Sequence, residues 1–275
     1  MPKKLDYSIV ASNIRAELKT YLEKSGLKSL VLGISGGIDS TLCVALARPV
    51  CDELGVELIG RSITIETNTD EERARAQEVG NVFCTDFKEV NLTGEYRIMK
   101  FGLSDREGVI DDDRADKIRN GNIKARMRMI YLYNLAQTRN GMVLSTDNYT
   151  ELLLGFWTLH GDVGDYGMVQ NLWKTEVYEL SRWIAENENT LAYDVVKNAM
   201  MHGVDAVPTD GLGITNSDLE QLGADTYDEV DEQLQNYDPE NERTKVTHRM
   251  ITSQFKRENP FNLPREVVVA GAENE

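Results

Sequence analysis

Cysteine is scarce in this sequence. Cys43, Cys51 and Cys84 are the three cysteines among its 275 residues, and no two of them form a CxxC pair. An odd number of widely spaced cysteines indicates neither a disulfide framework nor a zinc site. We therefore expect these three side chains to be small apolar residues in a reducing compartment.

Positive charge is also scarce. The chain has 30 Lys and Arg residues against 46 Asp and Glu residues, which gives a net charge of −16. Because a long phosphate backbone is held by clustered Lys and Arg, this balance argues against a nucleic-acid partner.

Long apolar runs are missing as well. No stretch approaches the roughly 18–20 apolar residues that a membrane-spanning helix needs. Asp6, Arg15 and Glu17 interrupt what would have to be the apolar core of a signal peptide. The sequence predicts a cytoplasmic protein without a membrane partner.

Alternating strand and helix signals are what the sequence does contain. Apolar periodicity predicts, in chain order, a helix over 6–24, a strand over 29–34, a helix over 39–54, a strand over 56–65 and a helix from 70. This order is typical of an α/β fold with a doubly wound, mostly parallel sheet and helices on both faces.

The remainder of the chain continues this pattern less regularly. Further helices are expected over 123–137, 174–188 and 191–201, with a strand over 142–145. Residues 94–122 show no sustained periodicity, so we expect a long connection there. We predict a single domain over 1–275, with an N-terminal helix at about 6–24 and a C-terminal segment of helices and loops at about 205–275.

The most informative motif lies between the first strand and the following helix. It reads Gly33-Ile34-Ser35-Gly36-Gly37-Ile38-Asp39-Ser40, which matches neither a Walker A loop nor the GxGxxG spacing of a dinucleotide fold. Glycines, serine hydroxyls and a helix N-terminus together favour phosphate binding. A carboxylate such as Asp39 beside phosphate makes sense if Mg²⁺ lies between them.

This motif resembles the pyrophosphate loop of the ATP pyrophosphatases, or PP-loop superfamily, whose fold is similar to that of the adenine nucleotide alpha hydrolases. Members adenylate an acceptor oxygen with ATP and release pyrophosphate before a nucleophile displaces AMP. The resemblance implies that all eight residues, 33–40, bind ATP.

Later motifs resemble one family within this superfamily, the ammonia-dependent NAD⁺ synthetases. They are Gly121–Met129, Ser145–Glu151, Gly155–Thr158 with Gly161-Asp162, Leu172–Leu180, Pro208-Thr209, Leu222-Gly223 with Tyr227–Asp231, and Ser253–Pro260. The resemblance implies amidation of deamido-NAD⁺ by ammonia in a homodimer with substrate sites near the interface. Glutamine-dependent relatives carry an additional amidase domain, for which 275 residues leave no room, so free ammonia is the expected nitrogen source.

The resemblance also implies roles for single residues. Thr146, Lys174 and Thr209 are expected to contact ATP, Glu151 is expected to join Asp39 as a magnesium ligand, and Arg126 is expected to bind deamido-NAD⁺. Judged from the residues alone, Glu151 is equally a solvated carboxylate at a helix start, Arg126 one charge on an exposed helix face, and Thr209 a turn residue after proline.

Two departures from the family pattern affect the expected site for deamido-NAD⁺. Leu159 stands where the family has a substrate-binding lysine, so that contact is lost or supplied by His160. Phe255-Lys256 replaces a His-Lys pair, and phenylalanine can stack on a ring but cannot donate a hydrogen bond.

The expected chemistry needs groups that handle both the leaving pyrophosphate and ammonia. We predict that Lys174 offsets charge on the pyrophosphate, and that Asp162 or Asp165 binds ammonium and accepts its proton, with Asp165 also contacting deamido-NAD⁺. Two alternatives remain open: another PP-loop adenylating ligase that acts on tRNA or a different carboxylate, and a nucleotide-binding regulator with impaired catalysis.

Overall fold

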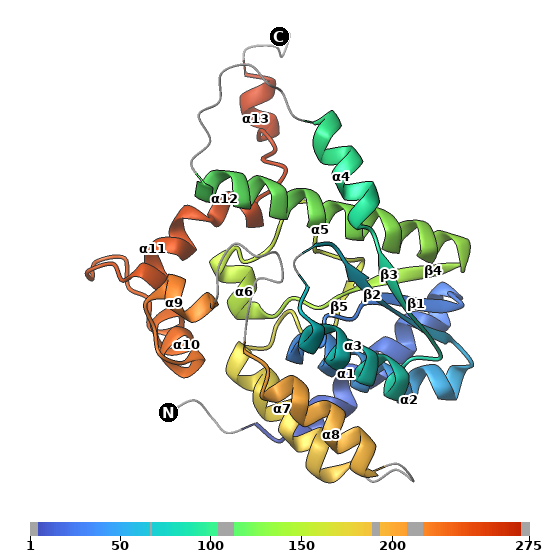
Figure 1. Cartoon of the computed structure of the whole chain (residues 1–275). Coiled ribbons are helices and arrows are strands. Elements are labelled where there is room, and N and C mark those ends of the chain that lie inside the picture. The colour runs from blue at the N-terminus through green and yellow to red at the C-terminus, as the bar shows by residue number, and fades with distance from the viewer. Residues whose placement is uncertain (1–4, 67, 104–112, 189–192, 208–216, 271–275) are drawn as a thin grey trace, which may run out of the picture.

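The computed structural model describes residues 5–66, 68–103, 113–188, 193–207 and 217–270. Its centre is a five-stranded sheet in the order β3-β2-β1-β4-β5, in which every pairing is parallel. The strands are β1 Ser29–Gly33, β2 Glu57–Thr64, β3 Asp86–Asn91, β4 Gly141–Ser145 and β5 Tyr166–Gly167. The predicted α/β fold with a doubly wound parallel sheet is confirmed (Figure 1).

Alternating residues of β1 pack into two separate hydrophobic cores, one on each face of the sheet. Leu30 and Leu32 pack with helices α1, α2, α3, α7 and α8, whereas Val31 packs with α5 on the other face. These helices are α1 Tyr7–Ser25, α2 Ile38–Leu54, α3 Asp70–Phe83, α5 Asp113–Thr138, α7 Lys174–Asn187 and α8 Tyr193–Val204. Because side chains alternate across a strand, one apolar run supplies both cores.

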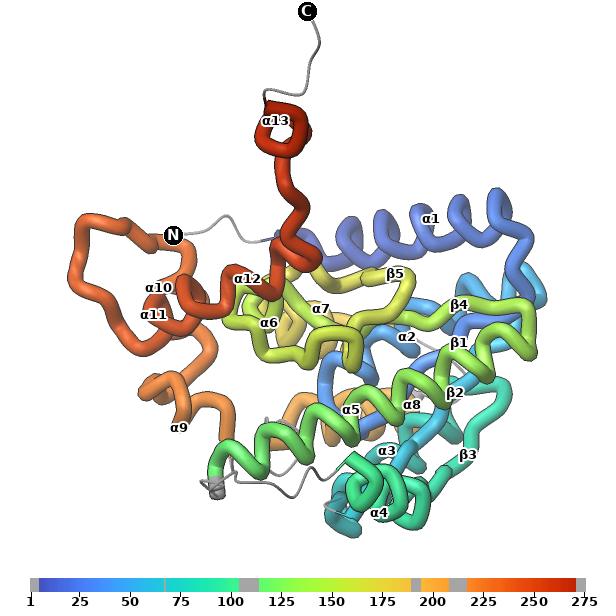
Figure 2. Tube along the Cα trace, turned by 90° about the horizontal axis from the view of Figure 1, so that it is seen from above, coloured from blue at the N-terminus to red at the C-terminus, as the bar shows by residue number. Residues whose placement is uncertain are grey.

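A smaller apolar cluster joins the C-terminal helices to the body. Leu154 of α6, Tyr149–Leu154, packs with Leu222 and Val230, which belong to the helices that follow α8. The C-terminal helices are α9 Asp218–Leu222, α10 Tyr227–Gln235, α11 Lys245–Thr252, α12 Gln254–Arg257 and α13 Arg265–Val268. Figure 2 shows α9–α11 gathered beside α6, and α13 projecting beyond them.

The long connection expected over 94–122 is wrong for the residues that the structure describes there. Helix α4 spans Thr93–Gly102 and α5 already begins at Asp113, while 104–112 lie outside the described residues. The periodicity there is weak because the described residues of α4 and of the first turns of α5 bury few side chains. Tyr96 is the buried residue of α4, and residues 114–120 are exposed or half-buried.

The described part of the chain contains no helix long and apolar enough to cross a membrane.

Candidate functional site

The loop between β1 and α2 is folded tightly around its serine side chains. Ser40 Oγ lies 3.1 Å from Ser35 Oγ, and the Gly37 N–H donates to Ser35 Oγ at 3.1 Å. Gly36 has a φ of +78°, and a Cβ there would lie 2.7 Å from the backbone nitrogen of Ala76 in α3. The loop thus presents hydroxyls and the N-terminus of α2 at the carboxyl edge of the sheet, where an anion is stabilised.

One backbone donor of this motif is already engaged. The Ile34 N–H donates to the Arg61 carbonyl at 2.9 Å in continuation of the sheet. The Ile34 N–H is therefore not available to a phosphate. Ile34 contributes to the site as a residue of the cavity lining.

Asp39, Glu151 and Lys174 meet at one point although they are far apart in sequence. Lys174 Nζ lies 2.5 Å from Asp39 Oδ2 and 3.0 Å from Glu151 Oε1. Asn148, the N-cap of α6, donates from Nδ2 to Asp39 Oδ1 at 2.9 Å and accepts from the Glu151 N–H. The helix starts of α2, α6 and α7 thus bring two carboxylates and one ammonium together.

Burial controls the protonation of this cluster. It raises the pKa of Glu151 to about 8, with the charge of Asp39 acting in the same direction. Burial alone would lower the pKa of Lys174, but Asp39 and Glu151 raise it well above its ordinary value. Lys174 is therefore charged at neutral pH and lies between two carboxyl groups.

A buried aspartate behind the cluster fixes the start of α7. Asp231 of α10 accepts from Thr150 Oγ1 at 2.5 Å and from the Thr175 N–H at 3.0 Å. Thr150 Oγ1 in turn accepts from the Lys174 N–H at 2.9 Å. Asp231 therefore positions Lys174 through the backbone of α7 without touching its ammonium group.

The loop after α6 contributes a second polar group. The Thr158 N–H donates to Asp162 Oδ2 at 2.5 Å, and Thr158 Oγ1 donates to Asn122 Oδ1 at 2.7 Å. Burial raises the pKa of Asp162, although its hydrogen bond from Thr158 opposes this. Lys256 Nζ donates to the carbonyls of Gly155, at 2.6 Å, and Trp157, and so ties α12 to this loop.

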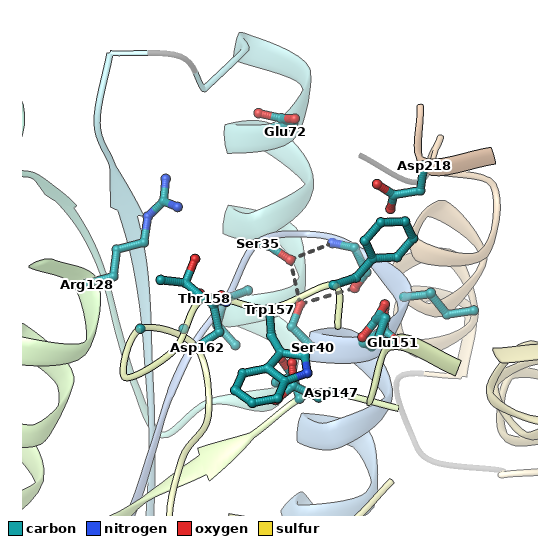
Figure 3. A pocket seen from close by; sticks show the side chains of 18 of the residues that line it. Ser35, Ser40, Glu72, Arg128, Asp147, Glu151, Trp157, Thr158, Asp162 and Asp218 are labelled. Carbon is teal, nitrogen blue, oxygen red and sulfur yellow. Dashed lines mark hydrogen bonds between the residues drawn. The ribbon is translucent and has the colours of Figure 1, made fainter. Parts of the chain in front are cut away.

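The serines of the loop, the cluster of Asp39, Glu151 and Lys174, and the pair Thr158 and Asp162 line one cavity of about 560 Å³. Figure 3 shows Ser35 and Ser40 between Glu151 on one side and Asp162 with Arg128 on the other. The cavity lies at the carboxyl ends of β1 and β4, where the order of strands reverses direction along the chain. Ligands of open α/β sheets bind at this switch point.

Most of the residues predicted from the sequence line this cavity. They are Gly33, Ile34, Ser35, Gly37, Ile38, Asp39, Ser40, Thr146, Glu151, Asp162, Lys174 and Lys256. Gly36 is turned toward α3 instead. Thr209 lies outside the described residues.

Four other predicted residues lie apart from the cavity lining. Arg126 and His160 are exposed, and Arg126 Nε donates to the Leu159 carbonyl at 3.1 Å. Phe255 is 60% exposed on α12. Asp165 accepts from the Val143 N–H at 2.9 Å and from Tyr133 Oη at 3.0 Å, so its carboxylate is already engaged in holding β4.

The lining also includes residues that were not predicted from the sequence, among them Arg61, Arg128 and Asp147. Arg61 forms a paired contact with Asp86 at 3.0–3.1 Å, and its lone charge within the apolar run of β2 was the available signal. Arg128 donates from Nε to the Ile63 carbonyl at 3.2 Å, and burial lowers its pKa. Asp147 is buried between Asp39 and Asp162, and burial raises its pKa to about 7.

The chain is similar in sequence to proteins of a known family. A family model described as NAD synthase matches residues 10–262. An NH(3)-dependent NAD(+) synthetase of Methanococcoides burtonii is 33% identical over 78% of this chain and 74% of its own length. One of Finegoldia magna is 30% identical over 92% and 95%, respectively.

Two solved structures share the fold. An NMN synthetase of Francisella tularensis has a TM-score of 0.75 at 24% identity, over 95% of this chain and 100% of that one. An NH3-dependent NAD synthetase of Campylobacter jejuni has a TM-score of 0.65 at 21% identity, with the same two coverages.

Proposed function

The chain belongs to the NAD synthase family, and on this premise we propose that it amidates the nicotinate carboxylate of deamido-NAD⁺ with ammonia at the expense of ATP. The observation that carries the proposal is the convergence of Asp39, Glu151 and Lys174 beside the phosphate loop, in the same cavity as Asp162. One cavity then holds both the groups proposed to bind the departing pyrophosphate and the carboxylate proposed to bind the ammonia nucleophile.

The first step is adenylation of the substrate. A nicotinate oxygen attacks the α-phosphorus of ATP, the bond from that phosphorus to the bridging oxygen breaks, and pyrophosphate leaves. The Ser35 and Ser40 hydroxyls and the N-terminus of α2 hold the departing phosphates, and the Lys174 ammonium offsets their growing charge.

The residues at this point also fit a magnesium ion. Mg²⁺ is bound by one or two carboxylates together with phosphate oxygens and water, and Asp39 and Glu151 supply two oxygen donors beside the loop. The described residues contain no group of three or more acidic, histidine or cysteine side chains that could hold a metal, so the ATP phosphates would complete the shell. When bound, Mg²⁺ supplies positive charge to the leaving group.

The second step forms the amide. Ammonia attacks the carbonyl carbon of the adenylate, the C–N bond forms, the C–O bond to phosphate breaks and AMP leaves. Asp162 is the carboxylate that accepts the proton from ammonium in this scheme, since it lines the cavity and burial raises its pKa. Asp165 positions β4 in this scheme.

One assay tests the activity directly. The protein is incubated with ATP, Mg²⁺, ammonium and deamido-NAD⁺, and NAD⁺, AMP and pyrophosphate are measured. We expect equal amounts of all three, each dependent on deamido-NAD⁺. Nucleotide binding without AMP release would favour a regulator, whereas AMP release only with a different carboxylate would favour another adenylating ligase.

Replacing Lys174 tests the leaving-group role. Lys174→Met is expected to lower kcat by roughly 10²–10³-fold, because a preorganised charge at the leaving group is lost. Arg182→Met, which removes an exposed cation from the same helix, is the control and should leave kcat unchanged. A kcat for Lys174→Met within a few-fold of the parent would contradict this role.

Replacing Asp162 tests the ammonia step. Asp162→Asn is expected to raise the KM for ammonium and to lower kcat by about 10²-fold, while the KM for ATP stays the same. Asp165→Asn should instead lower thermal stability, because Asp165 accepts two hydrogen bonds that hold β4. Unchanged ammonium kinetics for Asp162→Asn would remove Asp162 from the step.

The exposed positions of Arg126 and His160 bear on assembly. Both residues are candidates for contact with deamido-NAD⁺, yet both lie on the surface of a single chain. We infer a homodimer in which a second copy closes this part of the site, and sedimentation velocity at micromolar concentration should show it.

A further inference from the structure

Arg75 of α3 is a half-buried cation that the protein itself does not pair. Its Nε atom is buried and has no hydrogen-bond partner. The guanidinium forms no hydrogen bond or ion pair with any residue that the structure describes. A buried donor without an acceptor costs free energy, so such a group in a folded protein calls for a specific reason, and binding of a ligand is one.

Two carboxylates of α3 that could pair with Arg75 are engaged elsewhere. Glu72, three residues before it, accepts from the Thr69 N–H at 3.1 Å in the capping box that begins α3. Glu78, three residues after it, contacts His202 Nδ1 at 2.7 Å. Side chains three residues apart on a helix are neighbours and form ion pairs readily. Neither of these two carboxylates forms an ion pair with Arg75.

Arg75 lies directly beside the phosphate loop. A Cβ built on Gly36 would lie 2.8 Å from Arg75 Cβ, so the loop and α3 are in close contact at this point. Arg75 also lines the same cavity as Ser35 and Ser40. Figure 3 shows Glu72, one turn earlier on α3, above Ser35 of the loop. The unpaired arginine and the loop hydroxyls therefore border one space.

The cluster on the other side of the loop supplies no net positive charge. Lys174 Nζ lies 2.5 Å from Asp39 Oδ2 and 3.0 Å from Glu151 Oε1. With Asp39 ionised, the three groups together are neutral when Glu151 is protonated and negative when it is ionised. A phosphate chain needs a further cation beside the loop, and Arg75 is a cation whose charge no carboxylate offsets by direct contact.

We propose that Arg75 binds the β- and γ-phosphates of ATP from the α3 side of the loop and holds pyrophosphate after adenylation. This rests on the proposed function and adds a phosphate-binding residue to it. The assignment to these two phosphates follows from the contact with Gly36, because the loop is proposed to hold the departing phosphates. A guanidinium can donate two parallel N–H groups to phosphate oxygens, and its charge offsets the charge that grows on the leaving pyrophosphate.

Calorimetry tests this assignment without catalysis. Inorganic pyrophosphate and AMP are titrated separately into the full chain with Mg²⁺ present and deamido-NAD⁺ absent. Arg75→Met is expected to raise the Kd for pyrophosphate about 10–100-fold, because charge-assisted hydrogen bonds are lost, and to leave the Kd for AMP unchanged. Arg75→Lys, which keeps the charge but not the planar fork, should recover part of the affinity. Arg97→Met, which removes an exposed arginine paired with Glu66, is the control and should bind pyrophosphate like the parent.

Thermal unfolding separates phosphate binding from a structural role. Without ligand, Arg75→Met should unfold at the temperature of the parent or above it, because the variant no longer buries a donor without an acceptor. An equal loss of AMP and pyrophosphate affinity together with a lower unfolding temperature would show that Arg75 shapes the cavity, and would overturn the proposal. So would a parent that binds no pyrophosphate, or a Kd that Arg75→Met leaves unchanged. Absence of NAD⁺ formation by the parent would refute the proposed function but leave the pyrophosphate comparison intact.

Discussion

Asp147 is a buried carboxylate without a cation within hydrogen-bond reach among the contacts of the described residues. It is 7% exposed and accepts from Ser145 Oγ at 2.7 Å. Burial raises its pKa to about 7 from 3.8, with Asp162 and Asp39 adding repulsion. Because its pKa is higher in the folded chain than in the unfolded one, ionisation of Asp147 opposes folding once the pH exceeds its unfolded value.

Asp147→Asn is expected to stabilise the protein at high pH. Asparagine resembles the protonated acid, so the variant should gain about 1–3 kcal/mol in unfolding free energy at pH 8, and little at pH 4. Urea unfolding at both pH values, without magnesium, measures this. Asp225→Asn, at an exposed carboxylate, is the control. A gain at pH 8 no larger than that of the control would mean that Asp147 is paired or neutral there.

The site residues that the sequence identified share one property: each stands in a local motif with a chemical reason. In the run 33–40, the glycines, the serines and a carboxylate at a helix start together predict a phosphate-binding loop. Asp147 stands in a motif too, but its burial depends on how β4 meets α6, which no spacing encodes. Asp231 is similar, since its two partners lie 56 and 81 residues away.

Gly36 shows how an element constrains the phosphate loop. Its φ of +78° is in the left-handed region, and the space for a Cβ is filled by the backbone of Ala76 and by Arg75 of α3. Glycine is therefore required for two independent reasons, its conformation and the close approach of α3. The loop is held against α3 and presents its serines to the cavity on its other side.

Gly36→Ala is expected to cost about 1–3 kcal/mol in unfolding free energy and to raise the KM for ATP. Gly33→Ala is the matched control for stability, because its φ is not in that region and its Cβ would lie 3.7 Å from Leu132, an ordinary contact. Thermal unfolding of both variants gives the comparison. Equal stabilities would show that the loop can shift away from α3 at no cost.

The elements that the sequence predicted well are those with a regular pattern of buried apolar residues. Every boundary of α1, α2, β1 and β4 agrees with the prediction to within one residue. Strand β3 was not predicted, because it is the edge of the sheet and its residues Asp86–Asn91 are only half-buried or exposed. Strand β5 has two residues, too few for any pattern.

At the scale of the whole molecule, the C-terminal segment returns to the middle of the chain. Lys256 and Arg257 donate to carbonyls at the end of α6, about 100 residues earlier. Burial, assisted by Arg249, lowers the pKa of Lys256 to about 8. The sequence identified Lys256 by its motif, but only the fold shows that the same ammonium both secures the segment and borders the cavity.

This double role predicts opposite pH dependences for binding and stability. The affinity for deamido-NAD⁺, measured by calorimetry without ATP, should fall about 3–10-fold between pH 7 and 9, since a neutral amine attracts the dinucleotide phosphates less. Lys256→Arg, whose guanidinium keeps its proton, should bind deamido-NAD⁺ equally well at both pH values.

The stability of the fold depends on the same group in the opposite sense. Unfolded Lys256 has a pKa near 10.5, above the folded value, so between pH 8 and 10.5 the unfolded chain binds more protons than the folded one. Lys256 therefore makes the fold more stable as the pH rises through this range. A loss of affinity in that window therefore cannot be due to unfolding at Lys256. If affinity falls in parallel for the parent and Lys256→Arg, another group titrates and Lys256 does not bind the substrate.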